Sequence, residues 1–363
     1  MKITHIHIER FRGFQNEDFE VGSLLTAIAG QNGTQKSTLL GIITQTFTLK
    51  TEDSMRVEKP LCGGSYISAF KDKFRLSPTF DKPKGHEWTI SFDAGMDDFT
   101  VESIKRTGDP NVRFWKKGAR QEGDGYISFP TIFLSLKRLV PVAEEAKIIT
   151  DDTLLTQEEL NEFKQLHNKI LIAQTPISSA TTITSKNKQS IGVSTELYDW
   201  NQNSMGQDNL GKIILALFSF KRLHDKYPRQ YKGGILAIDE MDATMYPASQ
   251  VELLKVLRKY ASKLNLQILF TTHSMSLLKA MDDLVQEVTK KEETANQAKI
   301  LYLKKVDDKI AIKQGVNFKG IQLDLNVVAE GNNRKKNRIT AYTEDKENIL
   351  FVKARLLCWI LWM

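Results

Sequence analysis

The sequence predicts an α/β fold in which helices cover both faces of a largely parallel sheet, with an antiparallel β insertion between its two halves. A strand at 24–29 runs through a glycine loop into a helix at 37–47. Continuous apolar strands at 234–238 and 266–271 alternate with helices, which is typical of a parallel sheet buried on both faces. Residues 50–125 instead hold short β-prone runs separated by turn clusters, which indicates hairpins.

The first half of the chain is predicted to be mostly strand. Ile3, Ile6 and Ile8 follow a loose alternation that favours an opening strand. Two further β-prone runs, Trp88–Phe92 and Phe99–Val101, belong to the 50–125 region, which we expect to form an insertion or an antiparallel outer sheet.

The second half is predicted to alternate strands and helices. Tyr126–Leu136 is apolar and β-prone, and Glu158–Ile172 is helical. The Ser, Thr, Lys and Asn content of 176–195 predicts a loop. Leu210–Leu223 and Gln250–Leu264 are predicted helices, because their apolar residues recur at three- and four-residue spacing.

Composition excludes several classes of protein. The chain has 363 residues, enough for two domains or one large domain with an insertion. Hydrophobic residues make up 41% and charged residues 26%, which excludes disordered and collagenous chains. The apolar run Ile349–Met363 is broken by Lys353 and Arg355 and is too short for a membrane span, and the N-terminus has no signal-peptide core. We therefore expect no membrane partner.

The cysteine content and the net charge indicate the expected cellular compartment and binding partners. Cys62 and Cys358 are the two cysteines, too few for a disulfide framework and without metal-ligand spacing nearby, so a reduced cytoplasmic setting is expected. The net charge of +7, from 51 basic and 44 acidic residues, is compatible with binding phosphates or nucleic acid.

The most informative motif is a glycine loop between a predicted strand and a predicted helix. A phosphate-binding loop needs inward backbone N–H groups, a helix N-terminus, a lysine for the β/γ phosphates and a hydroxyl for Mg²⁺. The candidate nucleotide-binding residues of this P-loop are Gly30, Asn32, Gly33, Gln35, Lys36, Ser37 and Thr38. Gln35 stands where the motif has its second glycine, so its side chain either crowds the β-phosphate or requires an unusual backbone angle.

Two predicted strands are followed by further candidate catalytic and metal-binding residues. The strand at 234–238 ends in Asp239 and Glu240, of which the first suits Mg²⁺ coordination and the second suits orienting or deprotonating an attacking water. The strand at 266–271 leads to His273, placed where it can hydrogen-bond a γ-phosphate. An acidic loop or a lone histidine is by itself more often structural, but their order after the glycine loop favours an NTPase.

A fourth element precedes the long apolar helix. In Asn203-Ser-Met-Gly-Gln207, the hydroxyl of Ser204, the backbone of Gly206 and the helix N-terminus are suited to binding phosphate, with Gln207 beside them. The alternative is that Ser204 only caps this helix within its own subunit.

The order of these four elements resembles the ABC-type ATPase heads of the SMC/RecF class, as does the opening Ile8–Phe14. Phe133–Pro141 resembles a segment of the overcoming-lysogenisation-defect (OLD) nucleases and related anti-phage defence ATPases. The resemblance implies a P-loop NTPase with an ABC/SMC-head-like mixed sheet over residues 1–330. It implies bound ATP and Mg²⁺, with a metal site at Ser37 and Asp239.

The same resemblance implies roles for the other residues. Glu240 is the expected catalytic base, His273 the sensor of the γ-phosphate, and Ser204 and Gly206 the groups that reach the nucleotide of a second subunit. The expected assembly is therefore a homodimer or higher oligomer with composite ATP sites. Because Gln35, Asn203 and Met205 depart from the family pattern, we expect slow or conditional turnover.

The tail from 331 to 363 suggests a second domain. After the basic run Arg334–Arg338, a strand-like segment ends at Glu344 and an apolar helix-like stretch follows. This resembles the start of a TOPRIM nuclease domain, with Glu344 as a metal-binding glutamate. The later Asp-x-Asp pair of that domain is missing, so the expected domain is incomplete. The alternative is a strand and helix that dock on the ATPase.

A basic stretch is the local candidate for DNA contact. Lys105, Arg106, Arg113–Lys117 and Arg120 flank a turn and are suited to a basic, aromatic-studded hairpin. The alternative is a solvated sheet edge protected by charge.

The sequence thus favours an ABC/OLD-type ATPase of a bacterial anti-phage system that dimerises through nucleotide and senses or clamps DNA. Two alternatives stay open: a RecF-like DNA-repair ATPase, and a nucleotide-dependent scaffold that recruits a partner nuclease or another defence component.

Overall fold

The computed structural model describes residues 1–67, 69–93, 95–105, 112–118, 124–140, 148–151, 154–185 and 189–330. The chain divides into two units, Met1–Ile321 and Gln322–Met363. The helix α7 (Phe318–Glu330) contains the division point. The predicted domain boundary at 330 and 331 stays a prediction.

The central sheet carries the candidate site. Its strands run in the order β16 (Lys309–Lys313), β15 (Ala298–Val306), β3 (Leu25–Gly30), β14 (Leu266–Thr272), β13 (Gly234–Ile238) and β9 (Thr131–Leu134). The neighbouring pairs from β15 to β9 are parallel, and β16 is antiparallel to β15. The residues after β3, β14, β13 and β9 therefore meet at one edge of a mixed sheet, which confirms the predicted fold class.

A second, antiparallel sheet packs over the first. It runs in the order β2 (Phe14–Glu20), β1 (Ile3–Phe11), β5 (Glu87–Phe92), β6 (Phe99–Lys105) and β7 (Val112–Lys116). Strands β5, β6 and β7 of the region 50–125 thus form an outer sheet jointly with the N-terminal strands. Helix α1 (Lys36–Thr44) contributes Leu39 and Ile43 to a core that also holds Trp88 and Leu269, so one hydrophobic cluster joins α1 to both sheets.

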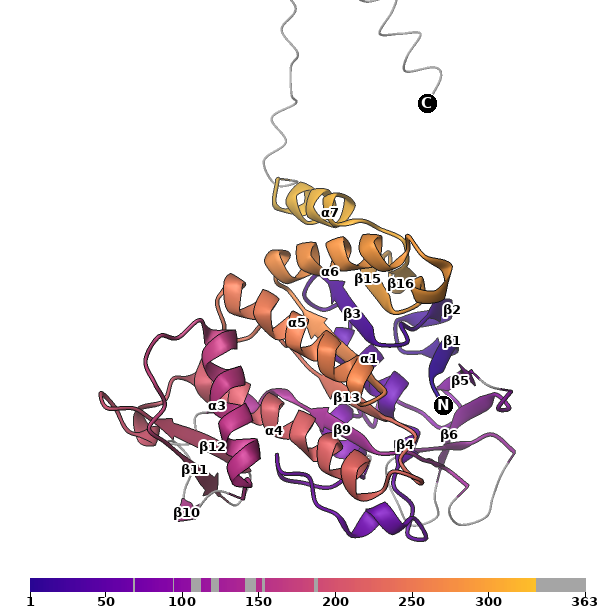
Figure 1. Cartoon of the computed structure of the whole chain (residues 1–363). Coiled ribbons are helices and arrows are strands. Elements are labelled where there is room, and N and C mark those ends of the chain that lie inside the picture. The colour runs from indigo at the N-terminus through magenta and orange to yellow at the C-terminus, as the bar shows by residue number, and fades with distance from the viewer. Residues whose placement is uncertain are drawn as a thin grey trace, which may run out of the picture. The chain divides into compact units, whose positions relative to one another are not determined.

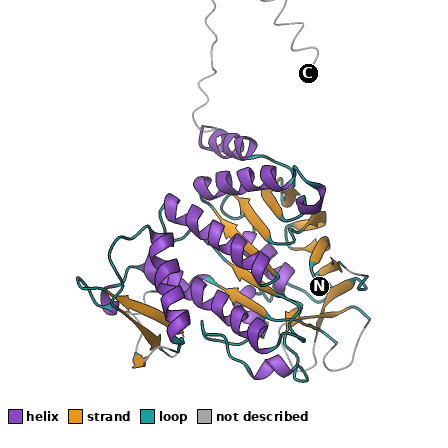
Figure 2. Cartoon of the chain, in the orientation of Figure 1, coloured by secondary structure: helices purple, strands orange, loops and turns teal. Residues whose placement is uncertain are grey.

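Three long helices, α4 (Met205–Lys226), α5 (Pro247–Lys263) and α6 (Met275–Val288), line the central sheet (Figures 1 and 2). Helix α3 (Gln157–Leu171) packs on α4 and α5. The shorter elements are β4 (Phe47–Thr48), α2 (Phe70–Lys73), β8 (Ile127–Ser128) and the 3₁₀ turns η1 (Ser54–Val57), η2 (Leu136–Leu139), η4 (Trp200–Gln202) and η5 (Glu292–Thr294). No helix in the described part of the chain is long and apolar enough to cross a membrane.

The loop predicted over 176–195 is wrong. The segment holds β11 (Ser179–Thr184) and β12 (Gln189–Ser194), which pair antiparallel, with β10 (Ile149–Asp151) on the outer side of β11. Its Thr, Ile and Val residues suit a pleated surface, and β12 lies on α4, where Gly211 lets the Ile191 carbonyl approach closely. Tertiary packing here overrides a polar composition.

Helix α4 begins earlier than predicted, at Met205 instead of Leu210. The reason is a capping box: Ser204 Oγ accepts from the Gln207 backbone N–H at 3.3 Å, and Gln207 Oε1 accepts from the Ser204 N–H at 2.8 Å. The same polar residues that were predicted to bind phosphate therefore also start the helix.

Candidate nucleotide-binding site

The glycine loop joins β3 to α1 as the motif predicts. Gly30 has φ +151° and packs against the Leu303 carbonyl, and Gly33 has φ +80°, so both positions need glycine. The Lys36 ammonium lies inside the loop and donates to the carbonyls of Gly30 at 3.0 Å and Gln31 at 2.9 Å. Lys36 is only 7% exposed, and burial lowers its pKa, while the nearby carboxylates oppose that shift. The remaining loop positions, Asn32 and Ser37, are exposed, and Thr38 is half-buried.

Gln35 adopts the backbone angle that a glycine would adopt there. Its φ of 62° and ψ of 32° are left-handed, and its side chain does not cap α1. The side-chain amide lies against Gly13, at the turn between β1 and β2, and its buried Oε1 has no hydrogen-bond partner among the described residues. Of the two consequences expected for Gln35, the unusual backbone angle is confirmed.

A hydrogen-bonded chain links the loop to the two strands beside it. Ser37 Oγ donates to Asp239 Oδ1 at 2.8 Å. Thr271 Oγ1, on β14 between them, donates to the same carboxylate oxygen at 2.7 Å and accepts from the Glu240 N–H at 2.6 Å. The hydroxyl and carboxylate proposed for Mg²⁺ are therefore adjacent, and Thr271, which the sequence analysis missed, orients both acidic residues. A buried threonine near the end of an apolar strand gives no sequence signal for this role.

His273 lies at the same edge. Its Nε2 is 3.9 Å from Glu240 Oε1, and its backbone N–H donates to Asp242 Oδ1 at 3.3 Å. Burial and the charge of Lys36 lower the pKa of His273, while Glu240 and Asp242 oppose the shift. The structure thus brings together the predicted residues of the loop, the acidic pair and the histidine.

The segment Asn203–Gln207, which caps and begins α4, makes its hydrogen bonds away from the glycine loop. Ser204 and Gln207 form the capping box described above, and Gln207 Nε2 donates to the Tyr198 hydroxyl at 2.7 Å. Gly206 packs against the Thr244 carbonyl, since a Cβ at Gly206 would lie 2.5 Å from that oxygen. Among the described residues, no hydrogen bond or ion pair of Ser204 or Gln207 reaches the glycine loop.

One buried arginine completes the acidic turn. Arg138 follows β9 and is 2% exposed, and its guanidinium donates to the Glu240 carbonyl at 2.7 Å. It also donates to Asn209 Oδ1 at 2.7 Å. Arg138 lies in the OLD-like segment, but its role has no sequence signal, because a sequence pattern cannot tell a buried arginine from an exposed one.

The predicted DNA-contact hairpin is partly buried. Strand β7 lies at the edge of the outer sheet, as the alternative reading expects. Phe114 is a core residue whose ring packs edge-on to Trp88, so the prediction of an aromatic stacking surface is wrong at this position. Lys117 forms an ion pair with Glu87. Arg106 and Arg120, like Glu344 in the tail, lie outside the described residues.

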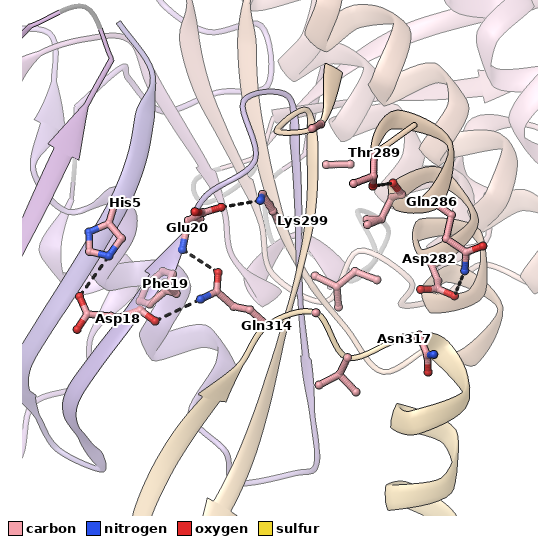
Figure 3. Close-up of a pocket in the computed structure, with 16 residues that line it drawn as sticks. His5, Asp18, Phe19, Glu20, Asp282, Gln286, Thr289, Lys299, Gln314 and Asn317 are labelled. Atoms are coloured by element: carbon pink, nitrogen blue, oxygen red, sulfur yellow. Dashed lines mark hydrogen bonds and ion pairs between the residues drawn. The ribbon is translucent and has the colours of Figure 1, made fainter. Parts of the chain in front are cut away.

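A separate pocket of about 810 Å³ lies between β1, β2, α6, β15 and the end of β16 (Figure 3). Glu20 pairs with Lys299 there at 2.6 Å, and the side chain of Gln314 hydrogen-bonds the β2 backbone at Glu20 and Asp18. No residue of the glycine loop, the acidic pair or His273 lines this pocket, so it is separate from the candidate nucleotide site.

A family model described as an AAA ATPase domain matches residues 1–189 and 134–278 of the sequence. The chain belongs to this family. Together the two stretches contain the glycine loop, Ser204, the acidic pair and His273, so the candidate site lies within the matched ATPase domain.

Solved structures show the fold. The SMC head bound to the C-terminal winged-helix domain of ScpA has a TM-score of 0.51 and 14% identity, covering 89% of this chain and all of that chain. The SMC head domain from Thermotoga maritima (TM-score 0.47, 14% identity, 87% and 100% coverage) and the Smc head from Pyrococcus furiosus with an extended coiled coil, bound to the C-terminal domain of ScpA (0.48, 13%, 90% and 99%), are also similar. No curated protein matches the sequence.

Proposed function

We propose that this chain hydrolyses ATP at composite sites formed between two copies of itself. The observation that carries the proposal is the chain of hydrogen bonds from Ser37 through Asp239 and Thr271 to Glu240. It supports the proposal because ATP hydrolysis needs oxygen ligands for Mg²⁺ and a general base beside a lysine-containing phosphate loop.

The residues present fit ATP and Mg²⁺. Ser37 Oγ and Asp239 Oδ1 are oxygen donors 2.8 Å apart, the type of ligand that Mg²⁺ takes while it keeps most of its waters. The Lys36 ammonium lies inside a glycine loop whose backbone N–H groups are suited to binding phosphate. When bound, Mg²⁺ neutralises charge on the phosphates. Glu240 orients and deprotonates the attacking water, and His273, kept neutral by its lowered pKa, hydrogen-bonds the γ-phosphate.

The second half of each site is proposed to come from the partner. Ser204 and the N-terminus of α4 are not bonded to the glycine loop of their own chain, and a helix N-terminus favours a phosphate by its dipole. The capping role of Ser204 leaves its hydroxyl at the first turn of α4. Two heads related by a two-fold axis would then enclose two nucleotides.

The test separates binding, turnover and assembly. Glu240→Gln should still bind ATP, hydrolyse it at least about a hundredfold more slowly, and accumulate as an ATP-bound dimer in light scattering. Mixing Lys36→Ala with Ser204→Arg should restore roughly half the activity per mixed dimer, because both lesions then share one site. Ser204→Ala is the matched control for loss of the helix cap, which costs about 1 kcal/mol. Wild-type hydrolysis by Glu240→Gln removes this residue from the mechanism. No recovery at any ratio, with exchange of subunits demonstrated, contradicts contact between subunits.

We further propose a role in DNA-directed anti-phage defence. The OLD-like segment Phe133–Pro141, the net charge of +7 and the TOPRIM-like position of Glu344 support it. A Mg²⁺-dependent nuclease assay on the full chain tests whether the incomplete TOPRIM-like tail contributes any cleavage. Loss of activity in Glu344→Ala would favour a nuclease, and unchanged activity would favour the clamp or the scaffold. If the wild type does not cleave, a RecF-like clamp or a scaffold for a partner nuclease becomes the better account.

A further inference from the structure

Arg138 is a buried cation held by neutral oxygens. Its guanidinium donates to Asn209 Oδ1 and to three backbone carbonyls, those of Leu134, Ser135 and Glu240. Burial lowers its pKa to about 10, and the more distant carboxylates at 239, 240 and 242 raise it, so the group is charged at neutral pH. Burying a guanidinium without a directly paired carboxylate is costly, and a residue that only filled space here would be apolar.

The contacts of Arg138 join two elements that the proposed mechanism uses. Through Nη2 it holds the backbone of Glu240, and through Nε it holds Asn209 in the first turns of α4. Asn209 in turn donates from Nδ2 to the Ala243 carbonyl at 2.9 Å. Close packing of Gly206 on the Thr244 carbonyl adds a second junction between the same two elements. The start of α4 and the turn 240–244 are therefore fastened together.

The backbone conformation of Glu240 depends on these hydrogen bonds. Its φ of 49° is left-handed, a conformation that costs a non-glycine residue about 1–2 kcal/mol and persists only when neighbours enforce it. Its N–H is held by Thr271 and its carbonyl by Arg138. Release of the carbonyl would let the residue relax and move the carboxylate, and a displacement of about 1 Å at a reacting group can cost about a hundredfold in rate.

We propose that Arg138 and Asn209 are positioning residues that couple the N-terminus of α4 to Glu240. This coupling rests on the proposed function: a phosphate of the partner's nucleotide that engages α4 shifts its first turn, and the Asn209–Arg138 link transmits the shift to the base in the same chain. Hydrolysis then depends on dimer formation, although Arg138 touches neither nucleotide nor water.

Arg138→Lys is the sharpest variant, since it keeps the charge but one ammonium cannot bond both Asn209 and the Glu240 carbonyl. We expect kcat to fall by about ten- to a hundredfold, with ATP affinity and KM within about threefold of wild type. Asn209→Ala should do the same. In a Glu240→Gln background, neither change should reduce single-turnover hydrolysis further, because the base they position is already removed.

Arg222→Lys is the matched control. Arg222 lies on α4, the helix that also holds Asn209. Its Nε and Nη2 donate to the Glu159 carboxylate, and its Nη2 also donates to the Leu154 carbonyl. The structural link is also measured without turnover: hydrogen exchange over 239–244 and 204–210 should accelerate in Arg138→Lys and not in Arg222→Lys.

Three results overturn the inference: unchanged kcat in Arg138→Lys, equal losses in kcat and ATP affinity, or a further loss in the Glu240→Gln background. If Arg138→Lys unfolds, the test moves to Asn209→Ala, in which the Arg138 guanidinium keeps its three backbone carbonyl acceptors. If the wild type binds no ATP, the proposed function fails, while hydrogen exchange still decides whether Arg138 joins the two segments.

Discussion

Replacing Gln35 with glycine should make the protein more stable and its ATPase faster. The left-handed backbone costs Gln35 about 1–2 kcal/mol relative to glycine. Glycine loses more chain entropy on folding, which takes back about 0.4–1 kcal/mol. Removing an amide oxygen that is buried without a hydrogen-bond partner adds a gain that offsets the lost packing on Gly13. The net expectation is about 1 kcal/mol, or roughly 2 °C in melting temperature for a domain of this size.

The assay compares thermal unfolding of wild type, Gln35→Gly and Gln35→Ala, together with steady-state hydrolysis at saturating MgATP. Gln35→Ala removes the amide but keeps a Cβ at positive φ, so it isolates the backbone contribution. The reasoning requires Gln35→Gly to be more stable than Gln35→Ala and to turn over faster than wild type. If Gln35→Gly is the least stable of the three, the side chain contributes more through its packing on Gly13 than the backbone strain costs, and the argument is refuted.

Two further predictions concern buried side chains. Burial lowers the pKa of His167 to about 4, below an unfolded value near 6.5, so the unfolded state binds the proton more readily and stability falls as pH drops from 6.5 to 4. This pKa difference corresponds to about 3 kcal/mol of unfolding free energy. The melting temperature of His167→Phe should therefore differ less between pH 7 and pH 4.5 than that of wild type does, and an unchanged difference would contradict the lowered pKa of His167. Thr271→Val keeps the shape but removes the hydrogen bonds of Thr271 to Asp239 Oδ1 and from the Glu240 N–H. The kcat should fall at least about tenfold in a steady-state assay, whereas an unchanged kcat would remove Thr271 from the site.

The parallel sheet and the residues at its edge were predictable from sequence. The apolar runs that precede Asp239 and His273 favour buried parallel strands. The C-terminal ends of parallel strands lie at the same edge of the sheet, so these residues were expected to be close together. The glycine-loop motif predicted the turn between strand and helix, and the missing second glycine indicated an unusual backbone angle at Gln35.

Elements that depend on distant partners were not predictable. The strands at 179–184 and 189–194 have a loop-like composition and form because β12 packs on α4. The hydrogen bonds of Arg138 span up to 102 positions in sequence, and no local pattern indicates which acceptors a buried guanidinium will meet. The outer sheet likewise depends on β1 pairing with β5, more than 70 residues away.

Nucleotide binding by the full chain with Lys36 replaced tests the central claim most directly. Titration of a fluorescent ATP analogue with Mg²⁺ should show saturable binding by wild type and by Lys255→Ala, an exposed lysine on α5 that pairs with Glu252. Lys36→Ala should weaken binding by on the order of a hundredfold, because hydrogen bonds to charged phosphates are lost from a buried ammonium. Binding by Lys36→Ala with wild-type affinity would contradict the assignment of the phosphate loop.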